Sequence, residues 1–279
     1  MFEKIAKSAQ VISLPDIYIK LKELIQDPDY TMAEVALLVS RDPGMATRFL
    51  RVVNSPLNRR LCEIETVSHA VSLLGIGQVH DIVLSASVAE AFDGIRTDVM
   101  DMKKFWARSV YCAVMIKQLA LECEIMDTDR LFVTGLLHDI GHLFMYLEIP
   151  EESQQAIVKA KKLERPLYQA ERDLFGFDYA KLGGYVMGQW DLPKNLQAIT
   201  SFHPEPGKAT QFASETALLH LASMLVQAEF ESGAFGAGAF LVDPAAWQLT
   251  GLKEEHCLHA RQTAAEQFGA VTEEIFFGL

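Results

Sequence analysis

Apolar side chains recur at three- and four-residue spacing along most of this chain, which is the pattern of amphipathic helices. After Pro15 the apolar positions are Ile17, Leu21, Leu24 and Ile25. Comparable spacing predicts further helices over residues 31–39, 43–53, 66–74, 76–92, 103–121, 127–140, 151–163, 167–174, 179–189, 193–202, 213–231 and 254–268. No stretch of useful length alternates polar and apolar residues as a strand does. The sequence therefore predicts an all-α fold.

Capping residues mark several of the predicted helix ends. Thr31 is followed three residues later by Glu34, the spacing of a capping box, and Asp42-Pro43 places a proline in the first turn of the next helix. We expect Gly75 to separate two helices and Gly141 to end the helix that starts near residue 127.

The helical segments suggest one main domain with a C-terminal addition. We expect a domain over residues 1–225, made of an N-terminal helical part over about 1–100 and a core over about 101–225. Residues 226–279 are expected to form a helical extension packed on that core. Within it, the Gly/Ala-rich segment 233–240 predicts a loop anchored by Phe235 and Phe240.

Composition narrows the classes of function. The 279 residues carry a net charge of −12, which disfavours general binding to the phosphate backbone of nucleic acids. The N-terminus has no pattern of a secretory signal, and no apolar run is expected to approach the ~20 residues that cross a bilayer. We therefore expect a cytoplasmic protein with no membrane or nucleic-acid partner. The four cysteines have no metal-site spacing and are expected to be free thiols.

The strongest chemical signal is the pair His138-Asp139 at the end of an apolar helical run. Imidazole nitrogen and carboxylate oxygen are both metal ligands, but a catalytic metal needs three or more protein ligands and an open position. The pair also fits a structural role, in which the histidine bonds a carbonyl and the aspartate pairs with an arginine. His142 follows His138 at the i,i+4 spacing of one helix face. Gly141 lies between them and is expected to end the helix, which argues against a metal site shared by the two histidines.

A series of short motifs accompanies this pair along the chain. They are Leu14-Pro15, Asp42-Pro43, Arg48–Ser55, Ala70–Gly75, Phe105–Ser109, Gly135–Gly141 and Gly188–Pro193. In this order and spacing, over roughly residues 10 to 225, they resemble the HDOD family, an output-domain branch of the HD metal-dependent phosphohydrolase superfamily. The resemblance implies an HD-domain-like multi-helix bundle with additional N-terminal and C-terminal helices.

The resemblance also places the superfamily's metal ligands on residues of this chain. Those positions hold Arg108, His138, Asp139, Tyr179, Phe202, His203 and Ser223. The first histidine and the closing aspartate of the superfamily are thus replaced by Arg108 and Ser223. A guanidinium stays protonated at neutral pH and cannot ligate a metal. We therefore expect a vestigial site without a cofactor, in which Arg108 pairs directly with Asp139.

The alternative keeps a divalent metal (Fe, Mn, Zn or Mg) on the remaining ligands His138, Asp139 and His203, with Asp178 or His220 as further candidates. That chain would be a phosphohydrolase acting on a nucleotide or phosphodiester with an atypical ligand set. The replacements favour instead a non-catalytic signalling or regulatory module that binds a signalling protein or a small-molecule or nucleotide ligand. A helical scaffold whose old site has no role is the third interpretation.

Two other segments carry weaker signals. The segment Asp42-Pro43-Gly44, followed by Arg48 and Arg51, has the elements of an anion site at a helix N-terminus, although helix capping with ordinary surface charge explains it as well. Gly75-Ile76-Gly77 lacks the strand and third glycine of a dinucleotide site and indicates a turn between helices.

Overall fold

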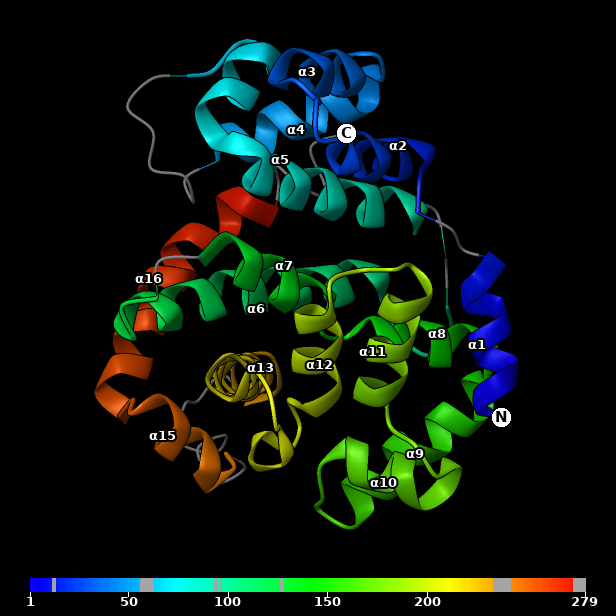
Figure 1. Ribbon diagram of the computed structural model, residues 1–279. Helices are drawn as coiled ribbons and strands as arrows, with labels where there is room; N and C mark the ends of the chain where they lie inside the picture. The colour runs from blue at the N-terminus through cyan, green and yellow to red at the C-terminus, as the bar shows by residue number, and fades with distance from the viewer. Residues whose placement is uncertain are drawn as a thin grey trace. The chain divides into compact units, whose positions relative to one another are not determined.

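The computed structural model describes residues 1–11, 14–55, 63–92, 95, 97–125, 128–232 and 242–272, and in these residues all regular secondary structure is helical (Figure 1). This confirms the predicted all-α class. The chain divides into two compact units. Unit 1 comprises Met1–Ile12 and Ile95–Ala264, and unit 2 comprises Ser13–Gly94 and Ala265–Leu279. The larger segment of unit 2, Ser13–Gly94, therefore interrupts the sequence of unit 1 after its first helix.

Unit 2 is built around one long helix. Its helices are α2 (Asp16–Gln26), α3 (Met32–Ser40), α4 (Pro43–Asn54) and α5 (Val67–Ala91), and the first three all pack on α5. Both predicted N-termini form. The Thr31 hydroxyl accepts a hydrogen bond from the backbone N–H of Glu34, and the Glu34 carboxylate accepts one from the backbone N–H of Thr31. The Asp42 side chain caps the N-terminus of α4. Helix α4 ends at Asn54, whose side-chain amide bonds both backbone polar groups of Ile64.

Helix α5 is two helical pieces joined at Gly75, which has φ 77°. A positive φ is accessible to glycine without strain, so the predicted break falls where the sequence placed it. By length and composition, α5 passes as a helix that could cross a membrane. This overturns the expectation that no segment approaches that length. The piece after Gly75 is only about 24 Å long, against about 30 Å for a hydrocarbon core. Ten of the 25 residues of α5 are buried.

Unit 1 holds the His138-Asp139 pair and the rest of the helices. In chain order these are α1 (Phe2–Val11), α6 (Met102–Glu122), α7 (Thr128–Leu137), α8 (Ile140–Glu148), α9 (Pro150–Lys162), α10 (Leu167–Phe175), α11 (Tyr179–Gln189), α12 (Lys194–Phe202), the 3-10 turn η2 (Pro206–Lys208), α13 (Ala213–Ser232), α15 (Pro244–Thr250) and α16 (Glu254–Thr272), whose last residues belong to unit 2. Helix α6 forms the centre, with α7 and α13 packed along it (Figure 1).

Glycines let the helices around the site approach closely. A Cβ atom on Gly135 of α7 would lie 2.6 Å from the Cα of Ala113 in α6. One on Gly141 of α8 would lie 1.9 Å from the carbonyl oxygen of Tyr179, at the start of α11. These distances are far below van der Waals contact, so the α6–α7 and α8–α11 contacts require glycine at these positions.

The predicted helix boundaries differ from the structure at the HD pair. The helix over 127–140 ends at Leu137, and Gly141 does not end a helix but lies in the first turn of α8, which was not predicted. Helix α1 was not predicted either. It packs on α8 and α11, and the ring of Phe2 lies 5.1 Å from that of Tyr185 in α11.

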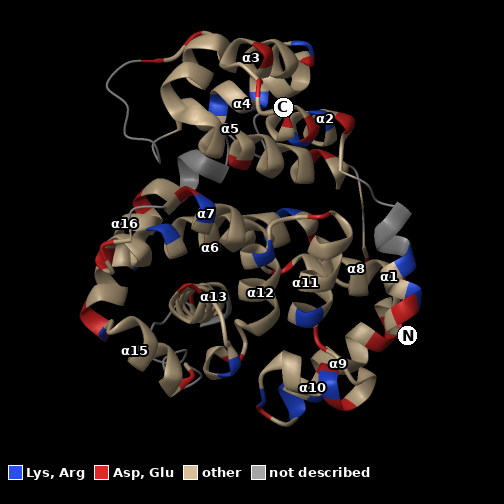
Figure 2. Ribbon diagram, in the orientation of Figure 1, with Lys and Arg blue, Asp and Glu red and all other residues tan. Residues whose placement is uncertain are grey.

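Some expectations fall outside the described residues, namely the loop over 233–240 with its Phe235 and Phe240 anchors, and Cys62. Cys112, Cys123 and Cys257 are free thiols as expected. Charged residues are frequent along α9 and α10, whereas most residues of α6 and α13 are uncharged (Figure 2).

Candidate functional site

His138 and Asp139 form the short turn between α7 and α8. The Nδ1 atom of His138 donates to the carbonyl oxygen of Gly135 at 2.7 Å, since a carbonyl can only accept. The imidazole is buried, and burial lowers the pKa of His138 below its ordinary value. His138 is therefore a neutral side chain whose first partner is the backbone of the preceding helix.

The Asp139 carboxylate turns toward His142, one turn further along α8. Its Oδ1 atom lies 2.5 Å from His142 Nδ1, while His142 Nε2 lies 2.8 Å from Oε1 of Glu171 in α10. The other carboxylate oxygen of Glu171 accepts from the backbone N–H of Tyr179 at 3.0 Å. Burial disfavours the charged imidazole, but the carboxylates of Asp139 and Glu171 outweigh it and raise the pKa of His142 to about 10. We call these three side chains the acidic clamp.

Two aromatic rings enclose the imidazole of the acidic clamp. The Tyr179 ring stacks on His142 at a centroid distance of 3.9 Å, and the Tyr146 ring lies on it at 5.2 Å, both with an interplanar angle of 11°. Burial raises the pKa of the Tyr179 hydroxyl well above its ordinary value, with Asp139 and Glu171 adding to the effect, so the hydroxyl stays protonated.

His203, at the C-terminal end of α12, faces the same interior. Its Nδ1 atom donates to the carbonyl oxygen of Thr200 at 2.7 Å, and its Nε2 atom accepts from the Tyr179 hydroxyl at 2.9 Å. Burial, with His138 nearby, lowers the pKa of His203 to about 3. The rings of His138 and His203 lie edge to face at 5.6 Å. The structure thus brings His138, Asp139, Tyr179 and His203 together.

Helix α13 adds His220 and Ser223 behind His203. His220 Nδ1 donates to the carbonyl oxygen of His203 at 2.8 Å, and its Nε2 atom accepts from the backbone N–H of Asp243 at 2.9 Å. The Ser223 hydroxyl donates to the carbonyl oxygen of His220 at 2.9 Å. His220 therefore joins the backbone at His203 to that at Asp243, whereas Ser223 bonds only within α13. Burial lowers the pKa of His220.

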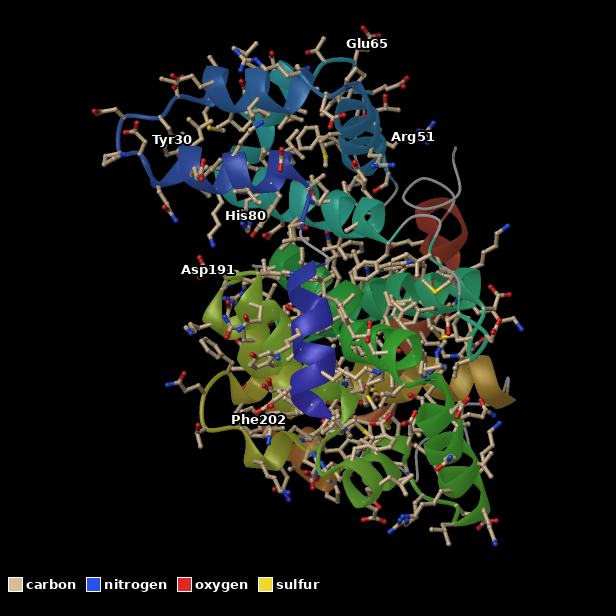
Figure 3. All side chains as sticks on the ribbon, turned by 90° about the vertical axis from the view of Figure 1, so that its right-hand side faces the viewer. Tyr30, Arg51, Glu65, His80, Asp191 and Phe202 are labelled. Atoms are coloured by element: carbon tan, nitrogen blue, oxygen red, sulfur yellow. The ribbon has the colours of Figure 1, made fainter. Side chains whose placement is uncertain are left out.

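Two residues predicted for the site lie differently. Arg108 in α6 is half-buried and its charge helps to lower the pKa of Asp139, but its guanidinium is not within ion-pairing distance of that carboxylate. The prediction of an Arg108–Asp139 salt bridge is wrong, because the Asp139 carboxylate bonds the imidazole of His142 instead. Phe202 is 42% exposed and lies at the surface of unit 1 (Figure 3), whereas its neighbour His203 is fully buried.

The donor set does not fit the metal centre that the superfamily has at these positions. Across the described ranges, no three His, Cys, Asp or Glu side chains gather in a group that could hold a metal ion. Asp139 bonds the imidazole of His142, His203 Nε2 accepts from Tyr179, and His220 bonds only backbone atoms. The alternative ligands His138, Asp139 and His203 lie near one another, but among the described residues they do not form a group that could hold a metal ion. Asp178, the other candidate, caps α11 and pairs with Arg172.

Glu171 and Tyr146 are the site residues that the sequence did not single out. Glu171 lies 29 residues after His142 and reaches it from α10, which packs on α9 and α11. The signal available in the sequence was the i,i+3 pair Asp139 and His142 on one helix turn, which is a favourable spacing for an ion pair.

Comparisons with known proteins agree with this arrangement. The model of the HDOD domain matches residues 11–206. A curated relative, an uncharacterized protein of Treponema pallidum (strain Nichols), is 23% identical over 201 residues, which are 68% of this chain and 37% of the relative. The chain therefore spans little more than a third of that relative.

Solved structures share the fold at low sequence identity. An HDOD domain protein of unknown function from Geobacter sulfurreducens has a TM-score of 0.76 at 20% identity, covering 95% of this chain and 93% of that one. A presumed phosphohydrolase from Shewanella amazonensis SB2B has a TM-score of 0.75 at 20% identity, covering 98% of both chains. A presumed signal transduction protein from Marinobacter aquaeolei VT8 has 0.70 at 19%, covering 94% of this chain and 59% of that one. With the motif order, the HD pair and the matched family model in agreement, this chain belongs to the HDOD domain family.

Proposed function

We propose that this chain is a non-catalytic signalling module that acts by binding a partner protein or a small molecule. The acidic clamp is the observation that carries this proposal. In a metal-dependent hydrolase the aspartate of the HD pair would hold a cation, and one coordination position would stay open for water. Here the Asp139 carboxylate holds the imidazole of His142, and His142 is in turn held by Glu171.

The residues around the clamp support the same proposal. Arg108, Tyr179 and Ser223 stand where the superfamily has metal ligands, and none of them is a good ligand for a divalent cation. Tyr179 donates to His203, and Ser223 donates to a backbone carbonyl. These side chains act as structural hydrogen-bond partners in a buried polar network, which a hydrolase would instead leave open to substrate.

The signalling part of the proposal draws on the family and on one neighbour. The Marinobacter aquaeolei protein, a presumed signal transduction protein, is longer than this chain, which covers 59% of it. A module that occurs within longer chains fits a role in passing a signal between domains or proteins. We place the protein in the cytoplasm and propose a signalling protein or a small-molecule or nucleotide ligand as partner, with no nucleic acid and no membrane.

A hydrolysis assay tests the proposal against the alternative of a metal-dependent phosphohydrolase. Purified protein is incubated with bis(p-nitrophenyl) phosphate and with cyclic dinucleotides in the presence of Mn²⁺, Fe²⁺, Mg²⁺ or Zn²⁺. We expect no turnover above the protein-free control, and none in Arg108→His, which restores only one ligand. Turnover by the wild type that is lost on chelation would contradict the proposal.

A further inference from the structure

Helix α1 lies along the outside of unit 1, against α8 and α11 (Figures 1 and 3). In the sequence, the unit 2 segment Ser13–Gly94 separates α1 from the rest of unit 1. Contacts between side chains, and not a neighbouring piece of chain, therefore hold α1 on unit 1. We call the surface of α8 and α11 that α1 covers the α1 seat.

The α1 seat makes three kinds of contact with the helix. The ring of Phe2 lies edge-on to two aromatic rings, at 5.0 Å from Phe177 just before α11 and at 5.1 Å from Tyr185 in α11. The Nζ atom of Lys4 donates to the carbonyl oxygen of Glu148, the last residue of α8, at 3.0 Å. A lysine is favourable there because the last carbonyls of a helix are partly negative and lack partners within the helix.

The third contact is aliphatic. Ile5 and Ala6 are buried, whereas Glu3, Lys4 and Lys7 of the same helix are exposed. Helix α1 is thus amphipathic, with one apolar side against the seat. It has 10 residues, and helices shorter than about 12–15 residues are marginal in water on their own. Helix α1 therefore depends on the seat for its structure.

The seat and its occupant differ in their relation to the family. The HDOD domain model matches residues 11–206, which include α8 and α11 but leave out nearly all of α1. The seat is therefore part of the family domain, whereas the helix that fills it is an addition to that domain. The same two helices carry His142 and Tyr179 of the candidate site.

We propose that the α1 seat is a docking site for an amphipathic helix of a partner protein, and that α1 competes with the partner for it. The partner helix has the pattern of α1, which is an aromatic residue, a basic residue two positions later and an aliphatic residue directly after that. Recognition of a helix in a groove uses such anchors on one helix face. This inference names the partner class of the proposed non-catalytic function and rests on it.

A peptide of residues 1–12, labelled with fluorescein at its C-terminus, serves as the probe. Its binding to the full chain is measured by fluorescence anisotropy. Ile5→Asp in the chain frees the seat, because burial of an unpaired carboxylate is costly. We expect the peptide to bind this variant at least about tenfold more tightly than the wild type, where α1 competes as a tethered ligand.

The matched control is Ile19→Asp, the same substitution at an exposed position of α2. We expect this variant to bind the peptide as weakly as the wild type. A peptide that itself carries Ile5→Asp should bind none of the proteins. Tyr185→Ala, added to the Ile5→Asp chain, should weaken binding of the unchanged peptide, because it removes a ring that contacts Phe2.

Equal binding of the peptide to the wild type and to Ile5→Asp overturns the inference, as does binding that Tyr185→Ala leaves unchanged. If Ile5→Asp does not fold, hydrogen exchange of the wild type decides. We expect amides of α1 to exchange at least about tenfold faster than those of α8 and α11, because α1 opens by itself, and equal protection overturns the inference. Phosphodiesterase activity of the wild type would contradict the proposed function, whereas an inactive chain that does not bind the peptide would contradict this inference alone.

Discussion

Glu171→Ala is the substitution that probes the acidic clamp most directly through stability. Glu171 is 1% exposed and bonds both His142 Nε2 and the backbone N–H of Tyr179. Truncation removes both acceptors at once. The imidazole of His142 then keeps one carboxylate, Asp139, and the first turn of α11 loses the acceptor for one of its N–H groups.

The cost follows from the burial of the groups left behind. Breaking a buried ion pair by removing one partner costs about 3–5 kcal/mol, because the remaining charge stays uncompensated. The unpaired N–H of Tyr179 adds to this, since a buried donor without an acceptor costs about 1–3 kcal/mol. Relaxation and water entry reduce the sum, so we expect Glu171→Ala to lower the free energy of unfolding by about 3–5 kcal/mol.

Urea unfolding at pH 7 measures this loss, provided the slope with denaturant is unchanged between variants. The control is Asp173→Ala, two residues further along α10. Asp173 forms ion pairs with Arg165 and Lys159, but its carboxylate is exposed. We expect no measurable loss for the control, because exposed ion pairs contribute little. A loss below about 1 kcal/mol for Glu171→Ala would refute the reasoning, since that is the size of an ordinary substitution.

Two further predictions concern packing and pH. Gly141→Ala would bring its Cβ to 1.9 Å from the carbonyl oxygen of Tyr179, so we expect it to destabilise the folded protein by about 1–3 kcal/mol or more. Gly77→Ala adds a methyl group in open space on a helical backbone, so we expect it to stabilise the protein by about 0.5–1 kcal/mol. Equal melting temperatures for the two variants would contradict this prediction. His203 has a pKa of about 3 against an ordinary 6.5, so the unfolded chain binds its proton first as the pH falls. The free energy of unfolding should therefore decrease below about pH 6.5, and His203 should account for about 2 kcal/mol of this loss at pH 5. Urea unfolding from pH 7 to pH 5 should show a smaller loss of stability for His203→Gln than for the wild type. An equal loss in the two proteins would contradict the prediction.

The helices could be predicted from the sequence because their signals are local. The capping box at Thr31 and the break at Gly75 depend on neighbouring residues, and both formed as expected. The continuation of the chain into α8 was missed because Gly141 resembles a helix stop. The reason for a glycine at position 141 is tertiary packing, because only glycine permits the close approach of α8 to the start of α11.

The site was predictable in composition but not in its bonding. The sequence indicated that the metal ligands were incomplete and that Asp139 would need a cationic partner. Arg108 is the expected partner because it stands at a ligand position of the superfamily. The position of a residue along a helix does not determine which atoms its side chain can contact. His142 is nearer, on the same turn as Asp139, and Glu171 completes its bonding from a helix that no local pattern connects to α8.

Elemental analysis of the purified chain tests the central claim most directly. The protein is produced in medium supplemented with Fe, Mn and Zn, purified without chelators, and its metal content per chain is measured. The account predicts well below one equivalent of any of these metals, because Asp139 is held by the protein's own imidazole and the ligand positions are occupied by Arg108, which cannot ligate a metal, and Ser223, which is a poor ligand. About two equivalents per chain, together with a phosphodiesterase activity that is lost on chelation, would contradict it.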